Sequence, residues 1–221
     1  MSQIFDLSDQ PDESVLAEAA AAAAVAISNS ELVLIPTDTS YAIICDAFNP
    51  SAVAKLRGTK RQTESVSIPV GAGNMATVDG IASFSEVGRD LVDAFWPGSL
   101  TVLTKNQPSV QLAVKNADQA LAVRIPNNPI AIAVLNATGP AAMTGAQLSG
   151  GKPTTTISAV REIFGDAVTI YIDGGVLPGG QSSLVSALGE NLRLIRAGEL
   201  SLDDLRKVVP TLVDATKTRP S

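Results

Sequence analysis

The chain has 221 residues, of which 45% are hydrophobic and 17% charged, so it can bury the core of one sizeable globular domain. Its net charge of −6 and pI of about 4.6 argue against a broad nucleic-acid-binding surface. The chain has no histidine and a single cysteine, Cys45, which excludes Ser-His-Asp and Cys-His catalysis, internal disulfides and cysteine-cluster metal sites.

Apolar runs and helical periodicity alternate along the chain, separated by glycine, proline and short polar turns. The clearest local signals are an alanine-rich stretch with acidic residues in its first turn, and Asn49-Pro50 as the cap and first-turn proline of a helix. In chain order, the pattern predicts a helix over 13–28, strands over 32–36 and 41–48, a helix over 51–58, a strand over 67–72, a helix over 85–96, strands over 100–105 and 120–126, a helix over 128–139, a strand over 140–146, a helix over 155–165, strands over 168–175, 182–188 and 192–198, and a helix over 201–209.

This order of elements predicts an α/β fold. The gaps between strands vary in length and several strands follow each other without a helix, which favours a twisted, mixed β-sheet flanked by helices over a regular doubly wound sheet. We expect one domain over residues 13–210, an N-terminal segment over 1–12 and a loose C-terminal tail over 211–221.

Polar, glycine-punctuated segments directly follow or end the expected strands. In α/β folds such segments meet in a common crevice, where ligands bind. Together they contribute hydroxyls, backbone amides and the cations Lys60, Arg61, Arg124 and Arg196, a set that suits a ligand with phosphate or carboxylate groups. The segments are 36–41, 59–65, 124–126, 143–151, 179–183 and 195–198.

Several of these segments match a known family in order and approximate spacing. PTDTSYAI, starting at Pro36, resembles the PTDTVYGL signature of the YrdC-like family. The motifs that follow in the family's order are FWPGSLT, AVRIPNNP, a strand with a Ser/Gly loop, IDGG, SSLVSA and LRLIRAG. The resemblance covers roughly residues 15 to 208 and implies a single YrdC-like domain.

The resemblance also implies an activity. Enzymes of this family condense L-threonine, bicarbonate and ATP, with Mg²⁺ as the ATP counter-ion, to threonylcarbamoyl-AMP and pyrophosphate. The product feeds the N6-threonylcarbamoyl modification of tRNA adenosine 37, so other tRNA-modification proteins are implied as partners. Such a site needs no histidine, because fixed cations that bring a carbamate and the α-phosphate together supply most of the catalysis.

Site residues carry over by position. The resemblance implies Lys60 and Arg124 as catalytic residues, and it implies no protein metal ligand. Substrate binding is expected from Thr37, Thr39, Tyr41 and Ser182. Nucleotide binding is expected from Lys60, Arg61, Gln62, Thr144, Gly145, Gln147 and Arg196.

The sequence departs from the family pattern mainly in these pocket positions. The K-x-R motif reads KRQ at 60–62, in a loop about two residues longer, so Gln62 lacks the permanent cation unless Arg61 takes its place. The S-x-N motif reads GAQ at 145–147, which removes a hydroxyl and lengthens the amide side chain. Losing two charge-assisted hydrogen bonds, each worth on the order of 1.5–3 kcal/mol, would weaken nucleotide binding by roughly 10²- to 10⁴-fold. Two further departures are Ala42 and Ser186.

Structural alternatives stand beside these roles. Thr37 and Thr39 are also typical of a turn whose side chains bond its own backbone. Lys60 and Arg61 are also typical of a solvated basic loop, and Cys45 is typical of an inert position in the core. As whole-protein alternatives we weigh a catalytically impaired paralogue that binds a nucleotide or a threonine-like ligand, and an RNA-binding module, which the acidic pI disfavours. No apolar run approaches the roughly 18 residues of a membrane span and no signal peptide is evident, so we expect a cytoplasmic protein.

Overall fold

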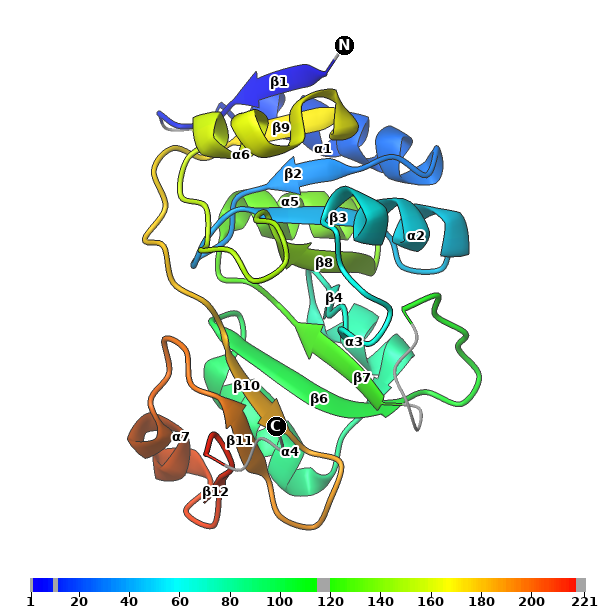
Figure 1. The fold of residues 1–221 in the computed structure, drawn as a ribbon. Helices are drawn as coiled ribbons and strands as arrows, with labels where there is room; N and C mark the ends of the chain where they lie inside the picture. The colour runs from blue at the N-terminus through cyan, green and yellow to red at the C-terminus, as the bar shows by residue number, and fades with distance from the viewer. Residues whose placement is uncertain (1, 10–11, 115–119, 218–221) are drawn as a thin grey trace.

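A computed structural model describes residues 2–9, 12–114 and 120–217 of the chain. Within these residues the fold consists of helices and of strands that join in one sheet (Figure 1). The helices are α1 (Glu13–Ser28), α2 (Pro50–Thr59), α3 (Met75–Ile81), α4 (Glu86–Phe95), α5 (Pro129–Thr138), α6 (Ile157–Phe164) and α7 (Leu202–Val208). The strands are β1 (Gln3–Asp6), β2 (Val33–Ile35), β3 (Ala42–Asp46), β4 (Val70–Gly71), β5 (Ala82–Ser83), β6 (Leu100–Asn106), β7 (Ala120–Arg124), β8 (Ala141–Gly145), β9 (Ile170–Asp173), β10 (Ser183–Ser186), β11 (Arg193–Arg196) and β12 (Val213–Asp214).

The sheet mixes parallel and antiparallel pairs. Its strand order is β1-β9-β2-β3-β8-β4-β7-β6-β10-β11-β12, with β5 paired to β6 off this path. The pairs β2–β3, β3–β8 and β8–β4 are antiparallel, whereas β9 pairs with β1 and β2 in parallel. The expected α/β fold with a mixed sheet and flanking helices is confirmed.

Strands β2 and β3 are buried on both faces of the sheet, and their successive residues point to opposite sides. Leu34 of β2 enters a core with α2 and α6, whereas its neighbours Val33 and Ile35 enter a second core with α1 and α5. A third core lies between α4, α7 and the sheet around β6 and β10. This two-sided burial explains why the β2 and β3 sequences are continuous apolar runs. None of the helices in the described ranges is long and apolar enough to cross a membrane.

Helix α1 owes its alanine-rich composition to close packing. It lies against α5, and its buried face is made of small side chains, among them Ala19 and Ala23, both fully buried beside Val134 and Leu135 of α5. A larger side chain on this face would have to push the two helices apart.

Some elements were not expected from the sequence. Within the N-terminal segment 1–12, Gln3–Asp6 forms β1 and pairs in parallel with β9. Residues 75–83 form α3 and β5, which the sequence pattern did not indicate. In the segment expected as a loose tail, Val213 and Asp214 form β12 beside β11, so the start of that tail is held by the sheet. Residues 218–221 of the expected tail lie outside the described residues.

A substitution in α1 tests the close packing of the two helices. We expect Ala23→Leu to lower the free energy of unfolding by about 1–3 kcal/mol, because the added methylenes overpack the α1–α5 contact. Ala21→Leu, at an exposed position of the same helix, is the matched control and should change it little. Urea unfolding monitored by circular dichroism measures both, and equal effects at the two positions would contradict the packing.

Candidate functional site

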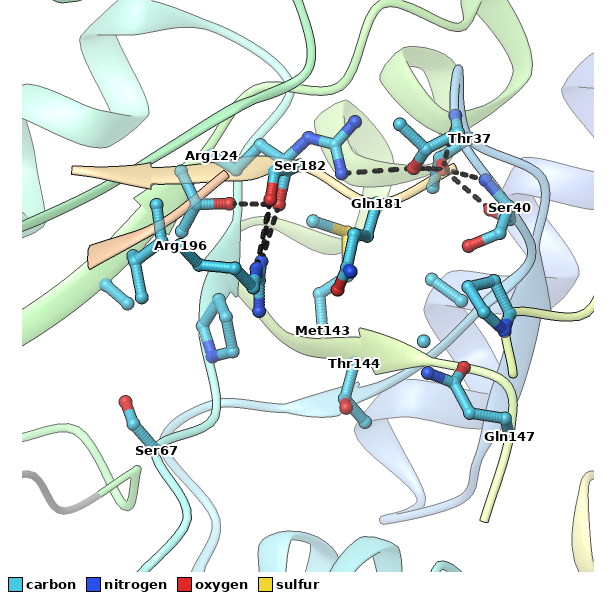
Figure 2. A pocket seen from close by; sticks show the side chains of 18 of the residues that line it. Thr37, Ser40, Ser67, Arg124, Met143, Thr144, Gln147, Gln181, Ser182 and Arg196 are labelled. Atoms are coloured by element: carbon cyan, nitrogen blue, oxygen red, sulfur yellow. Dashed lines mark hydrogen bonds between the residues drawn. The ribbon is translucent and has the colours of Figure 1, made fainter. Parts of the chain in front are cut away.

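A cleft of about 240 Å³ lies across the middle of the sheet, and Figure 2 shows the polar side chains that surround it. Its volume is more than ten times the roughly 10–15 Å³ that one water molecule occupies, so it can hold a ligand of several atoms. No carboxylate belongs to its lining in the part of the chain that the structure describes. The polar side chains of the lining are Thr37, Thr39, Ser40, Gln62, Ser67, Thr101, Thr144, Gln147, Gln181 and Ser182, together with Arg124 and Arg196.

The alternation of strand residues directs these side chains into the cleft. Thr101 of β6 and Arg124 of β7 line it, whereas their neighbours Val102 and Val123 point to the other face and enter the apolar cores. The strands that contribute, β3, β8, β7, β6, β10 and β11, are nearly consecutive in the sheet. Segments far apart in the sequence therefore meet in one site.

The loop between β2 and β3 forms the wall that carries Thr37 and Thr39. Both side chains line the cleft and are buried. Thr37 Oγ1 accepts from the backbone N–H groups of Thr39 and Ser40, each at 3.2 Å, and donates to the Ser40 carbonyl at 2.6 Å. Thr37 therefore both stabilises the turn expected from the sequence and lines the cleft. The hydroxyl oxygens of Thr37 and Thr39 lie 3.1 Å apart.

Arg124 is the most strongly held cation of the cleft. Its Nη2 lies 2.7 Å from Asp38 Oδ1, its Nε donates to the Gly98 carbonyl at 3.0 Å, and its Nη1 donates to Thr39 Oγ1 at 3.4 Å. Burial lowers the pKa of Arg124, the Asp38 carboxylate opposes this shift, and the positive charge of Arg196 adds to it. A guanidinium stays charged in proteins, so a buried cation faces the cleft.

Arg196 comes from β11 and has no carboxylate partner among the described residues. Its Nη2 donates to the Ser182 carbonyl at 2.8 Å and to Ser182 Oγ at 3.1 Å. Ser182 Oγ in turn shares a 2.7 Å hydrogen bond with the buried hydroxyl of Thr101. Partial desolvation lowers the pKa of Arg196. The network fixes a cation whose charge is left for a ligand to balance.

Lys60 lies at the C-terminal end of α2, only 4% exposed. Its Nζ donates to Thr144 Oγ1 at 2.9 Å and to the Gly145 carbonyl. Lys60 itself is not part of the lining, so its charge stands one hydrogen bond behind the cleft surface, through Thr144. Burial lowers the pKa of Lys60 from its ordinary 10.5 to about 8, and no carboxylate within the described ranges offsets this.

At the C-terminal end of α2, the side chains of Arg61 and Gln62 point in different directions. The N–H of Arg61 bonds the Gly58 carbonyl at 3.1 Å and the N–H of Gln62 bonds the Arg57 carbonyl at 2.9 Å, the pattern of a Schellman C-cap. Arg61 takes the left-handed position of this cap, with φ of 52°, and its side chain is exposed and outside the cleft lining. Gln62 lines the cleft instead, and Arg61 does not.

The segment after β8 contributes Thr144, Gly145 and Gln147 to the lining. The Gln147 side chain folds back over Gly145: a Cβ added at Gly145 would lie 2.5 Å from Gln147 Oε1. Oε1 atoms of Gln62 and Gln147 are both buried without a hydrogen-bond partner among the described residues. The two departures from the family motifs therefore place neutral amides in the cleft.

Tyr41, expected to bind substrate, does not line the cleft. The residue is fully buried, and its hydroxyl lies 2.8 Å from both Asp173 Oδ1 and the Gly175 carbonyl and accepts from the Gly174 N–H at 3.0 Å. Burial is the main cause of its raised pKa. Tyr41 thus fastens β3 to the IDGG turn after β9 and shapes the site indirectly.

Sequence reasoning missed five polar residues of the site. Ser40, Ser67, Thr101 and Gln181 line the cleft, and the Asp38 carboxylate pairs with Arg124 from outside the lining. Asp38 and Ser40 belong to the quoted PTDTSY motif and Thr101 to FWPGSLT, so the motifs marked the segments but not which of their side chains face inward. Cys45 is fully buried, and burial raises its thiol pKa to about 12, as for an inert core cysteine.

The donor set of the cleft does not fit a protein-held Mg²⁺. This ion usually binds one or two carboxylates besides substrate phosphates, and the described lining offers hydroxyl and amide oxygens only. No group of three or more His, Cys, Asp or Glu side chains within the described ranges is placed to hold a metal ion.

Three comparisons relate this chain to known proteins. A family model for Sua5, YciO and YrdC, described as "Telomere recombination", matches residues 25–198. A Mycobacterium tuberculosis protein named "Putative threonylcarbamoyl-AMP synthase" is 34% identical over 213 residues, covering 95% of this chain and 96% of that protein. The fold matches P. abyssi Sua5 complexed with L-threonine (TM-score 0.88, 24% identity, 96% of this chain and 62% of that one) and E. coli YciO (TM-score 0.82, 20% identity, 93% and 100%).

The buried lysine predicts a pH dependence of stability. Because the pKa of Lys60 is lower in the folded chain than its ordinary 10.5, the unfolded chain binds more protons between pH 8 and 10.5, and stability rises with pH in that window. We expect Lys60→Met to remove a rise on the order of 2–3 kcal/mol. Urea unfolding of both proteins at pH 7.5 and pH 10 measures the difference, and identical pH profiles would contradict a depressed lysine.

The tyrosine predicts a separation of stability from binding. Tyr41→Phe removes the buried hydroxyl that lies 2.8 Å from Asp173 Oδ1 and the Gly175 carbonyl and that accepts from the Gly174 N–H, which we expect to cost about 1–3 kcal/mol of unfolding free energy. Affinity for ATP and L-threonine, measured by calorimetry at a temperature where the variant is folded, should stay within about threefold. Unchanged stability with a large loss of affinity would instead make Tyr41 a substrate-binding residue.

Proposed function

Since the chain belongs to the family of Sua5, YciO and YrdC, we propose that it is a threonylcarbamoyl-AMP synthase. In this proposal L-threonine, bicarbonate and ATP yield threonylcarbamoyl-AMP, pyrophosphate and water. The product would be consumed by other tRNA-modification proteins in forming N6-threonylcarbamoyladenosine at position 37 of tRNA. We place this work in the cytoplasm, where these substrates and tRNA are found together.

The observation that carries the proposal is the charge of the cleft. The protein as a whole is acidic, at −6, yet Arg124 and Arg196 face a cleft whose described lining has no carboxylate, and Lys60 lies just behind it. Asp38 balances Arg124 from outside the lining, whereas Arg196 and Lys60 have no carboxylate partner among the residues that the structure describes. Buried cations without a counter-charge are costly, and an anionic ligand repays that cost.

The reaction needs such an arrangement. Threonine and bicarbonate form a carbamate, whose oxygen attacks the α-phosphate of ATP, and the bond to pyrophosphate breaks. Both partners are anions that repel each other, so cations fixed before the substrates arrive lower the barrier by holding them in line and by stabilising the charge on the phosphate. In this proposal Arg124 holds the carboxylate or carbamate, a role that its hydrogen bonds to the Gly98 carbonyl and to Thr39 support by fixing the guanidinium.

The other residues fit supporting roles. Ser182, oriented by Arg196 and Thr101, offers a hydroxyl to threonine, and Arg196 offers its guanidinium to the adenylate. Thr144 relays the charge of Lys60 to the phosphates. Bicarbonate as the carbon source and Mg²⁺ as the counter-ion of ATP are part of the proposal, and no step here depends on a metal ion held by the protein.

A pyrophosphate-release assay tests the function. We expect release from ATP that depends on both threonine and bicarbonate, and that falls at least tenfold in Lys60→Ala because a charge-assisted interaction with phosphate is lost. Activity should also decline as the pH rises through about 8, where Lys60 loses its proton. Lys55→Ala, an exposed lysine of the same helix, is the matched control.

Each result of this assay bears on a different function. Release no greater than that of Lys60→Ala, with ATP and threonine still bound in calorimetry, would replace the synthase by a binding protein without turnover. Absence of both release and binding would remove the nucleotide site altogether. A salt-sensitive mobility shift with RNA would favour the RNA-binding alternative.

A further inference from the structure

Residues 62–67, which follow the C-terminal cap of α2 and which we call the cleft loop, form one wall of the cleft. Gln62, Val66 and Ser67 of this loop belong to the lining. Figure 2 shows Ser67 and Gln147 on opposite sides of the cleft, so the loop faces the segment after β8. All six residues are at least partly exposed, and none belongs to an apolar core. Packing against a core therefore does not hold this wall in place.

Hydrogen bonds hold the cleft loop instead, and within the described ranges all those that join it to the rest of the chain run to Arg57 of α2. The Arg57 carbonyl accepts from the Gln62 N–H at 2.9 Å. The Arg57 guanidinium donates from Nη1 to the Thr63 carbonyl at 2.8 Å and to the Val66 carbonyl at 2.7 Å. The other hydrogen bonds of the loop stay within it, and they join Val66 to Thr63 and Thr63 to Ser65.

One nitrogen of Arg57 connects the two ends of a turn. The Val66 N–H bonds the Thr63 carbonyl at 3.2 Å, which closes a β-turn over residues 63–66, and Nη1 contacts the first and the last carbonyl of that turn. These bonds are charge-assisted and therefore stronger than bonds between neutral groups. Arg57 forms no ion pair with a carboxylate in the described part of the chain, so its guanidinium serves the loop alone.

We propose that Arg57 is a positioning residue of the cleft, which holds the cleft loop in place as a wall that excludes water and thereby raises the affinity for ATP. This inference rests on the proposed function for ATP as the ligand. Arg57 is not part of the lining, so it acts through the loop. Arg124 and Arg196 attract an anionic ligand more strongly where water is excluded, because the effective dielectric constant is lower there. A loop that moves freely admits water and removes its own part of the lining.

The kinetics of pyrophosphate release test the positioning role. We expect Arg57→Met to raise the KM for ATP about tenfold and to leave kcat within about twofold, because the wall is lost while the cations of the cleft stay in place. Arg57→Lys keeps the charge, but its side chain is one atom shorter and does not reach both carbonyls, so we expect the same result. Lys55→Met, at an exposed position of the same helix, is the matched control and should change neither constant.

Two kinetic results would overturn the proposal. A variant that only folds less well contains less active enzyme, so its apparent kcat would fall at an unchanged KM. A normal KM in Arg57→Lys would mean that the charge at position 57 matters and the two hydrogen bonds to the loop do not.

Proteolysis without any ligand measures the position of the loop directly. A glutamate-specific protease cleaves after Glu64 when the loop leaves its folded position, and Glu190, exposed between β10 and β11, serves as the internal reference. Relative to Glu190, we expect cleavage after Glu64 to be at least about fivefold faster in Arg57→Met and Arg57→Lys than in the unmodified chain or in Lys55→Met. Equal relative rates in all four proteins would contradict the role of Arg57.

The two measurements separate failure of this inference from failure of the proposed function. Where the unmodified chain releases no pyrophosphate, dissociation constants for ATP from calorimetry replace KM in the same comparison. Faster cleavage after Glu64 in a chain that does not bind ATP would overturn both the synthase and the role of Arg57 in ligand binding, and leave only its hold on the loop. Pyrophosphate release with an unchanged KM in both Arg57 variants would overturn this inference alone.

Discussion

The ion pair between Arg124 and Asp38 connects the parts of the molecule that surround the cleft. Its partners come from β7 and from the loop between β2 and β3, and they lie 2.7 Å apart with side-chain exposures of 7% and 17%. Asp38 Oδ1 also accepts from the Asn127 N–H at the entrance to α5, so one carboxylate joins a loop, a strand and a helix start. Breaking such a pair would leave a buried charge without compensation, which commonly costs about 3–5 kcal/mol.

Around this pair, the cleft concentrates cations at the expense of the stability of the ligand-free chain. Lys60 is almost fully buried and forms no ion pair with any carboxylate in the described part of the chain, and burial lowers its pKa to about 8. Arg124 and Arg196 repel each other across the same site. Residues that weaken the folded state and converge on one cleft are typical of a binding site, because only the ligand relieves them.

The departures from the family motifs change the cleft without disturbing the sheet. Gly145 keeps its place in β8 and its pairing with β3, while the amide of Gln147 takes the space that a side chain at 145 would need. Gln62 likewise reaches the cleft through an ordinary helix C-cap. Compared with the family motifs, the cleft has the neutral amide of Gln62 in place of a charged side chain, and Gly145 in place of a hydroxyl. The strands and the helix end that carry these residues are regular, and function depends on such side chains more than on the fold itself.

The sequence by itself determined the local elements and the segments of the site. Apolar runs and caps marked most strands and helices, since these depend on neighbouring residues. The polar segments that end or follow the expected strands hold much of the cleft lining, including Thr37, Arg124 and Ser182. The sequence pattern did not predict the short elements β1, β12 and α3, because a few residues carry no periodic signal. Strands β1 and β12 also form only by pairing with strands that are distant in the sequence or follow a turn.

Only the tertiary structure decided which side chains face the ligand. Arg61 and Gln62 are adjacent in sequence, yet the left-handed turn at Arg61 sends one to the surface and the other into the cleft. The Tyr41 hydroxyl bonds to Asp173 and Gly175, which lie more than a hundred residues further along the chain, and the side chain does not reach the cleft. The direction of a side chain depends on backbone angles at element ends and on such distant contacts, and neither is encoded in the spacing of a motif.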